Sequence, residues 1–231
     1  MLVLAAILFD FDGVLVDSER LHCETMADVM GDDGPPLDWE TYRQSLMGFD
    51  DRGAFAFLLK RAGIEPTPEE IRRRVERKAV LFAQQARAGR VAALPGAPTF
   101  VRACAAVLPL GLCSGALRSD IDPVLDSMEL RECFAELVTA DDVEFSKPDP
   151  TCYRLCLERL AARFPDQAIT AENAVAIEDT PDGIASARGA GLAVLGIATN
   201  LSIPELKAAG ASMAVDSLEG LGPGFLAGLL S

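Results

Sequence analysis

Histidine and positive charge are scarce in this sequence. Its 231 residues include a single histidine, and 21 lysines and arginines stand against 35 aspartates and glutamates, for a formal net charge of -14. So negative a protein repels polyanions, and we expect neither nucleic acid nor a membrane surface as a partner. A small anionic substrate is still compatible with this charge, because a bound cation and a few basic groups can reverse the potential inside a pocket.

Paired cysteine motifs and long apolar runs are also missing. The six cysteines have no CxxC spacing and mostly fall in apolar segments, which predicts reduced thiols in the core. Cys152 and Cys156 lie four residues apart in an expected helix, but no histidine near them supports a metal site. The first apolar run, 2–9, is too short to span a membrane and has no basic leader. We therefore expect a cytoplasmic enzyme with neither a membrane span nor a signal peptide.

Short apolar or β-rich runs recur along the chain, with helical patterns between them. These runs cover 2–9, 107–113, 136–139, 174–177, 193–197 and 213–215. Strands that alternate with helices predict an α/β protein with a Rossmann-like, mainly parallel sheet. In such a sheet the functional site forms at the carboxyl ends of the strands.

One long segment, from about residue 18 to 90, shows helical patterns and almost no strand. Thr67 is a good helix cap, followed by Pro68 in the first turn and Glu70 three residues after the cap. We predict a core domain formed by 1–17 and 92–231, with a helical cap domain, 18–91, inserted after the first strand. That position would let the helices close over the strand ends as a lid.

Polar residues stand at the ends of the apolar runs. Asp10 and Asp12 end the first run and precede Gly13, which allows a sharp turn. If the strands are parallel, all such residues meet at one edge of the sheet. The predicted site contains Asp10, Asp12, Ser114, Lys147, Glu178 and Asp179.

The charge of this site predicts a cation. Four carboxylates against one lysine leave a net charge of -3, and two like charges ~4 Å apart repel by about 4 kcal/mol at an effective dielectric constant of ~20. Raised carboxyl pKa values would relieve part of this repulsion. An oxygen-rich site without histidine suits a hard divalent cation, and we expect Mg²⁺ rather than Zn²⁺.

The same residues resemble the four motifs of the haloacid dehalogenase superfamily, over nearly the whole chain. Residues 10–15 (Asp-Phe-Asp-Gly-Val-Leu) are similar to the first motif, Ser114 to the second, Lys147 to the third and 178–179 to the fourth. The haloacid dehalogenases themselves lack the second aspartate of the first motif. Because Asp12 is present here, the resemblance implies phosphoryl transfer instead of dehalogenation.

The helical insertion, the continuation 16–19 and the segments 147–150 and 178–180 resemble the β-phosphoglucomutase-like subgroup. This resemblance implies that Asp10 is the nucleophile, forming an aspartyl phosphate, and that Asp12 acts as acid and then as base. It also implies that Ser114, Gly115 and Lys147 hold the phosphoryl group. The implied Mg²⁺ ligands are Asp10, the backbone carbonyl of Asp12, and Asp179, with Glu178 beside them as a ligand or as a holder of water.

Basic residues around the helical segment could contact the substrate. His22 matches a position near the active site of β-phosphoglucomutase, and Arg52, Lys78 and Arg118 are best placed to meet a second anionic group. On sequence alone, His22 is a helix residue with no necessary chemistry, and for Arg52, Lys78 and Arg118 we favour the interpretation as surface charges.

The sequence departs from the mutase pattern where a second phosphate would bind. Asp51 stands at the position of the phosphate-gripping arginine, with Arg52 one place later, and Ala116 and Leu117 replace a serine and a lysine. We therefore expect a Mg²⁺-dependent phosphatase of a small phosphate monoester, such as a sugar phosphate, acting as a monomer or weak homodimer. The alternatives are a β-phosphoglucomutase-type mutase and a catalytically silent protein that binds a phosphate ligand.

Overall fold

The computed structural model describes residues 3–31, 33–47 and 49–230. Its centre is a six-stranded sheet of β1 (Ala6–Phe9), β4 (Leu110–Cys113), β5 (Glu136–Val138), β6 (Ala174–Glu178), β7 (Ala193–Ile197) and β8 (Met213–Val215). The strand order is β5-β4-β1-β6-β7-β8, and every neighbouring pair is parallel. The predicted α/β class with a Rossmann-like parallel sheet is confirmed.

The inner strands β1, β4 and β6 are buried along their whole length, which explains their apolar sequences. The edge strand β8 is only partly buried. Along β1, Ile7 and Phe9 belong to one apolar cluster, whereas Ala6 and Leu8 belong to a second. From residue 97 onward, the helices are α5 (Ala97–Ala105), α6 (Arg118–Ser127), α7 (Thr151–Arg163), α8 (Pro181–Gly189), α9 (Ile203–Ala209) and α10 (Pro223–Leu226). Short 3₁₀ turns cover Arg131–Cys133, Pro165–Gln167, Ala171–Asn173 and Ala227–Leu230.

Two predicted strands begin several residues earlier in the sequence than in the structure. The run 107–113 yields a strand only from Leu110, because Val107 is exposed and Pro109 has no backbone N–H to donate to a neighbouring strand. The run 2–9 yields a strand from Ala6, and Leu2 lies outside the described residues, as do both chain ends of the predicted core domain, Met1 and Ser231.

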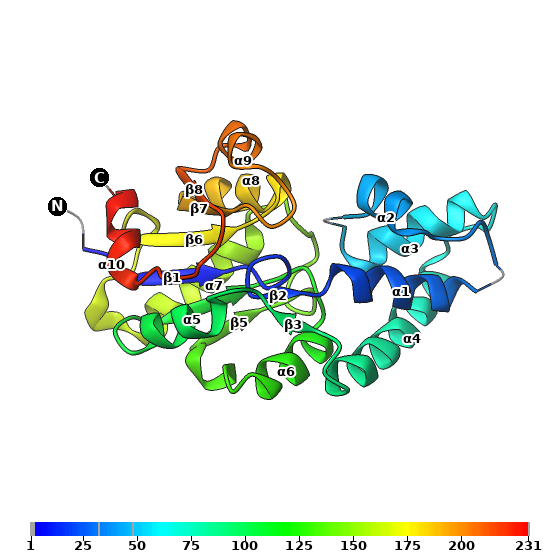
Figure 1. Cartoon of the computed structure of the whole chain (residues 1–231), viewed down its shortest axis with the longest axis horizontal. Helices are drawn as coiled ribbons and strands as arrows, with labels where there is room; N and C mark the ends of the chain where they lie inside the picture. The colour runs from blue at the N-terminus through cyan, green and yellow to red at the C-terminus, as the bar shows by residue number, and fades with distance from the viewer. Residues whose placement is uncertain (1–2, 32, 48, 231) are drawn as a thin grey trace.

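Four helices follow the first strand and form a group beside the sheet (Figure 1). They are α1 (Glu19–Met30), α2 (Trp39–Ser45), α3 (Asp51–Arg61) and α4 (Pro68–Arg87), and their facing apolar side chains form a separate core cluster. The predicted start of α4 is confirmed, because Thr67 accepts a hydrogen bond from the backbone N of Glu70 at 3.3 Å. Asp32 and Gly48, within the predicted cap domain, lie outside the described residues.

A small antiparallel ribbon connects the helical group to the sheet. β2 (Val16–Asp17) pairs with β3 (Ala92–Ala93), so the outgoing and returning chains lie side by side. Two-residue strands leave no periodic signal in a sequence, and this ribbon was not predicted. The domain boundaries that we predict at 17/18 and 91/92 fall at this ribbon.

All six cysteines are free, and five of them are buried, as expected of core thiols. Cys133 is only partly buried. Within the described ranges, no helix combines the length and the apolar character that crossing a membrane requires.

Candidate active site

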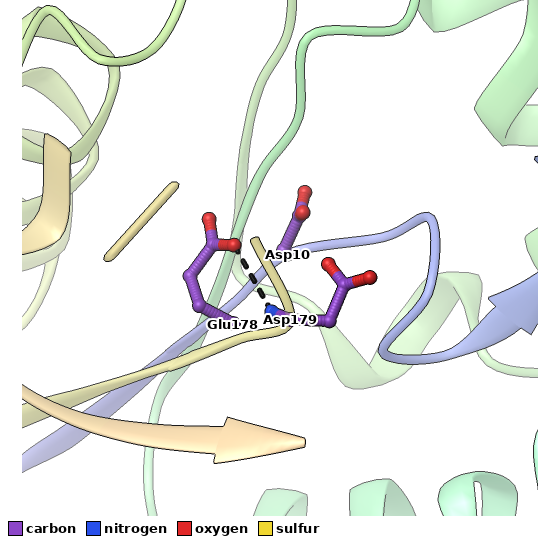
Figure 2. Close-up of side chains that lie close together, drawn as sticks. All are labelled: Asp10, Glu178 and Asp179. Atoms are coloured by element: carbon purple, nitrogen blue, oxygen red, sulfur yellow. Dashed lines mark hydrogen bonds between the residues drawn. The ribbon is translucent and has the colours of Figure 1, made fainter. Parts of the chain in front are cut away.

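The carboxyl ends of β1, β4 and β6 bring most of the predicted site together. β1 lies between β4 and β6, so Asp10 after β1 is flanked by Ser114 after β4 and by Glu178 at the end of β6. Figure 2 shows the carboxylates of Asp10, Glu178 and Asp179 gathered at this edge. Lys147 reaches them from the loop between β5 and α7. The parallel topology therefore brings these residues together at one edge of the sheet, and their roles stay predictions.

Lys147 joins two of the buried carboxylates. Its Nζ atom lies 2.8 Å from Asp10 Oδ1 and 2.6 Å from Glu178 Oε1. Burial by itself lowers the pKa of Lys147, but the charges of Asp10 and Glu178 outweigh it and hold that pKa well above its usual value. Burial and the charge of Glu178 raise the pKa of Asp10 to about 8, despite Lys147. A cation opposite Asp10 would favour its ionised form.

The Glu178 carboxylate is fully buried and its oxygens are all engaged. Oε1 accepts hydrogen bonds from Lys147 and from the Tyr153 hydroxyl at 2.7 Å. Oε2 accepts from the backbone N of Asp179 at 3.2 Å, the dashed line in Figure 2, and from the Thr180 hydroxyl at 3.5 Å. A Cβ at Gly183 would overlap Oε2. These contacts hold the Glu178 carboxylate in place, and through the bond to Oε1 they hold the ammonium group of Lys147 beside Asp10.

The residues present fit a hard cation. Ligand atoms of Asp10, Glu178 and Asp179 all lie within 4.8 Å of one another. Asp179 is 2% exposed, yet among the described residues its Oδ1 has no hydrogen-bond partner, and Oδ2 accepts only a 3.4 Å bond from Asn200. Burial, with the charges of Asp10 and Glu178, raises the pKa of Asp179 well above its usual value. A buried carboxylate oxygen without a donor is costly, and a divalent cation would supply the missing partner.

Asp12 faces the helical segment. It accepts a hydrogen bond from the Ser18 hydroxyl, and its Oδ1 lies 3.4 Å from His22 Nε2. Burial would raise the pKa of Asp12, but the hydrogen bond and charge of His22 outweigh it and lower that pKa. The His22 ring stacks on Phe82 of α4 at 4.4 Å between centroids. His22 thus contacts the predicted acid–base residue and is held there by the helices.

Ser114 and Gly115 line the same cavity as Asp10, Asp12 and Lys147. Ser114 is 2% exposed, and its Oγ accepts a hydrogen bond from the backbone N of Ala116 at 3.0 Å, which leaves its hydroxyl proton available. A Cβ at Gly115 would meet nothing within 4 Å. Gly115 therefore has open space on the side where a side chain would lie, and a ligand in the cavity could approach its backbone.

Arg52 and Arg118 do not line this cavity. Arg52 is half-exposed and its Nε lies 3.3 Å from Asp50. Arg118 donates to the backbone O of Leu137 at 3.0 Å and lies 3.6 Å from Asp142. In this structure both arginines contact other protein groups, either a carboxylate or a backbone carbonyl. Their contacts with a substrate stay predictions.

The interpretation of Lys78 as a surface charge is wrong. Lys78 has no exposed surface, and its Nζ lies 3.0 Å from Asp51 of α3 and 2.9 Å from Asp120 of α6. Two facing carboxylates offset the cost of burying an ammonium group. This ion triad joins the helical group to a helix of the sheet domain.

A sequence model of the haloacid dehalogenase-like hydrolases matches residues 4–191 of the chain. The chain belongs to this family. The predicted superfamily is therefore confirmed, and the protein is an enzyme of the hydrolase class.

Three similar proteins support the predicted subgroup. A phosphorylated carbohydrates phosphatase from Thermotoga maritima is 30% identical over 81% of this chain and 82% of its own length. The structure of a putative β-phosphoglucomutase from the same organism is 28% identical with a TM-score of 0.66, covering 92% of this chain and 94% of that one. The structure of a CbbY mutant from Rhodobacter sphaeroides in complex with xylulose 1,5-bisphosphate is 27% identical with a TM-score of 0.78. The match covers 96% of this chain and 98% of the CbbY chain.

In this member of the haloacid dehalogenase-like family, sequence reasoning missed two polar partners of the carboxylates. Tyr153 lies in the first turn of α7 and binds Glu178, whereas Asn200 follows β7 and binds Asp179. A tyrosine inside an apolar helix face needs a hydrogen-bond partner, which is the one signal that could have indicated Tyr153. Asn200 follows a strand end as the other site residues do.

Proposed function

We propose that the protein is a Mg²⁺-dependent phosphatase that hydrolyses a small phosphate monoester, a sugar phosphate or a similar metabolite. The observation that carries this proposal is the difference in surroundings at the first strand end, where Asp10 faces Lys147 and Asp12 faces His22. A relative named for phosphorylated carbohydrates supports the sugar-phosphate class. Two carboxylates in such different surroundings suit a nucleophile and an acid–base group.

In the first step, a carboxylate oxygen of Asp10 attacks phosphorus while the bond from phosphorus to the ester oxygen breaks. Asp12 gives its proton to the leaving oxygen, and the negative charge of the bound ester, which would raise the pKa of Asp12, favours the protonated form that this step needs. In the second step, Asp12 takes a proton from water as the water oxygen attacks phosphorus, which releases phosphate and restores Asp10. Ser114 and Lys147 donate hydrogen bonds to the phosphoryl oxygens. Ser18 and His22 keep the Asp12 carboxylate in place.

The residues that would hold Mg²⁺ are Asp10, the Asp12 backbone carbonyl and Asp179, with Glu178 next to them. When bound, the ion would offset negative charge on the transferring phosphoryl group. Residues 18–91 would form the cap domain over the core domain of 1–17 and 92–231. Through His22, this cap touches the acid–base residue itself.

Removal of the metal is expected to lower the hydrolysis of p-nitrophenyl phosphate on the order of 100-fold or more, because the transferring charge loses its largest compensating group. The measurement is phosphate release after treatment with EDTA and after readdition of MgCl₂. Activity should return with Mg²⁺ in the natural protein. Full turnover in EDTA, or no turnover of any ester in a broad panel with Mg²⁺, would contradict the proposed function.

Gly13→Ala is expected to raise the Mg²⁺ concentration for half-maximal activity about tenfold or more, because the new Cβ overlaps the Asp179 carboxylate. Gly13 also has a φ of 73°, which disfavours alanine by itself. Gly63→Ala is the matched control, since Gly63 has a φ of 74° and nothing within 4 Å of a Cβ. A magnesium titration in which both variants behave alike would count against the position assigned to the ion.

A further inference from the structure

The cavity at the predicted site has a second wall, supplied by the helical segment. Its acidic residues are Glu19 at the start of α1 and Asp50 and Asp51 at the start of α3. We call these three residues the acidic wall. They stand among Met26, Tyr42 and Phe49, which also line the cavity. The alcohol part of a bound ester would face this wall, because the phosphoryl group is held at the sheet edge.

The cavity has few positively charged side chains, and these already form ion pairs with the carboxylates at the strand ends. Among the described residues that line it, only Lys147 and His22 can be cationic. Lys147 is shared between Asp10 and Glu178, and His22 contacts Asp12. Neither of these groups is left to bind an anion on the alcohol part.

The two cations that contact the acidic wall, Lys78 and Arg52, are already engaged by carboxylates. Lys78 is fully buried between Asp51 and Asp120, and Arg52 is paired with Asp50 outside the cavity. Counted with Glu19, the wall and these partners contain four carboxylates and two cations, a formal charge of -2. The helical segment thus neutralises its own cations instead of presenting them to the substrate.

The oxygens of the wall suit hydrogen-bond donors. Glu19 Oε2 accepts from the Tyr42 hydroxyl at 2.6 Å, and Asp50 Oδ2 accepts from the Ser146 hydroxyl at 2.6 Å. These contacts hold two of the three carboxylates in position against the cavity. Hydroxyl and ammonium groups can donate to such fixed acceptors, whereas a carboxylate or phosphate is repelled by them.

We infer that the acidic wall makes the enzyme selective for phosphate monoesters whose alcohol part is uncharged or carries an amine, and that it rejects esters with a second anionic group. This inference rests on the proposed phosphatase function. It sets the chain apart from the related CbbY structure, which holds a bisphosphate. Selectivity arises here from repulsion of the wrong substrate as much as from attraction of the right one.

The test compares three esters that share one leaving group: 4-(hydroxymethyl)phenyl, 4-(carboxymethyl)phenyl and 4-(aminomethyl)phenyl phosphate. The methylene spacer keeps the phenol oxygens similar, so the esters differ mainly in distal charge. We expect kcat/KM for the carboxymethyl ester to be about tenfold below that of the hydroxymethyl ester, and the aminomethyl ester to equal or exceed the latter.

Variants of the wall make the test specific. Glu19→Gln should raise the ratio of carboxymethyl to hydroxymethyl kcat/KM about threefold or more, and Asp51→Asn should shift it in the same direction. Glu24→Gln is the matched control, because Glu24 lies on the same helix, is exposed, and pairs with Arg90 at 2.7 Å away from the cavity. A ratio is used because general loss of stability or activity does not move it.

The possible outcomes distinguish failure of the proposed phosphatase function from failure of the inferred selectivity. If none of the three esters is hydrolysed with Mg²⁺, the proposed function fails and the inference falls with it. If the hydroxymethyl ester is hydrolysed but the carboxymethyl ester is as good a substrate or better, only the inference is overturned. The same holds if Glu24→Gln moves the ratio as far as Glu19→Gln does. Should Glu19→Gln fail to fold, Asp51→Asn gives the required measurement.

Discussion

Asp10→Asn is expected to reduce kcat for p-nitrophenyl phosphate by at least about 10⁴-fold, because an amide cannot act as the nucleophile that forms the aspartyl phosphate. The substitution preserves the shape of the side chain. The amide oxygen introduced at position 10 would still accept the 2.7 Å hydrogen bond that the backbone N of Phe11 donates to Asp10 Oδ1. The loss should therefore be one of chemistry, and the folded structure should survive.

The measurement is the steady-state rate, together with thermal unfolding of each protein. Asp166→Asn is the matched control, since Asp166 is an exposed aspartate in the turn Pro165–Gln167 and does not line the cavity that contains Asp10. It should keep the natural rate. If Asp10→Asn retained more than about one hundredth of the natural kcat, Asp10 would not be the nucleophile.

Lys147→Met is expected to lower kcat/KM on the order of 10³-fold and to destabilise the fold by about 3–5 kcal/mol. The first effect follows because a donor to the phosphoryl group is lost. The second follows because Glu178, which has no exposed surface, would keep a buried charge without its ammonium partner. Lys207→Met, at an exposed position near the end of α9, is the matched control.

A double variant separates these two effects. Lys147→Met combined with Glu178→Gln removes the unpaired charge, so that much of the lost stability should return while activity stays low. Urea unfolding gives the free energy of unfolding, and phosphate release gives the activity. If Lys147→Met were as stable as Lys207→Met, the pairing of Lys147 with Glu178 would contribute little to the fold.

The sheet and the edge that carries the predicted site could both be predicted from the burial of the strands. Burial produces the apolar runs in the sequence, and it also makes the polar residues at their ends stand out. Strands that are buried on both faces need continuous apolar residues, so a polar residue such as Asp10 or Ser114 stands out where the strand ends. Parallel pairing then collects these ends at a single edge. The six strands and the gathering of the motif residues follow from this one cause.

The environment of Lys78 could not be predicted in the same way. Its two partners, Asp51 and Asp120, come from helices that are distant in sequence and meet only in the folded chain. On an amphipathic helix, a lysine is normally interpreted as a solvent-exposed residue. The acidic wall was equally hidden, because its members are spread over two helices whose facing sides the sequence does not specify.

The β2–β3 ribbon has a consequence for how such an enzyme can change. Val16 pairs with Ala93 and Asp17 with Ala92, so the chain departs from the sheet and returns to it at adjacent points. Any segment whose two ends lie equally close together could join the chain at those points without changing the pairing of the strands in the sheet. Recombination at this one place would exchange Glu19, Asp50 and Asp51 as a set and would leave Asp10, Ser114 and Lys147 on the sheet domain. His22 would be exchanged with them, so a new insertion would also have to supply a partner for Asp12.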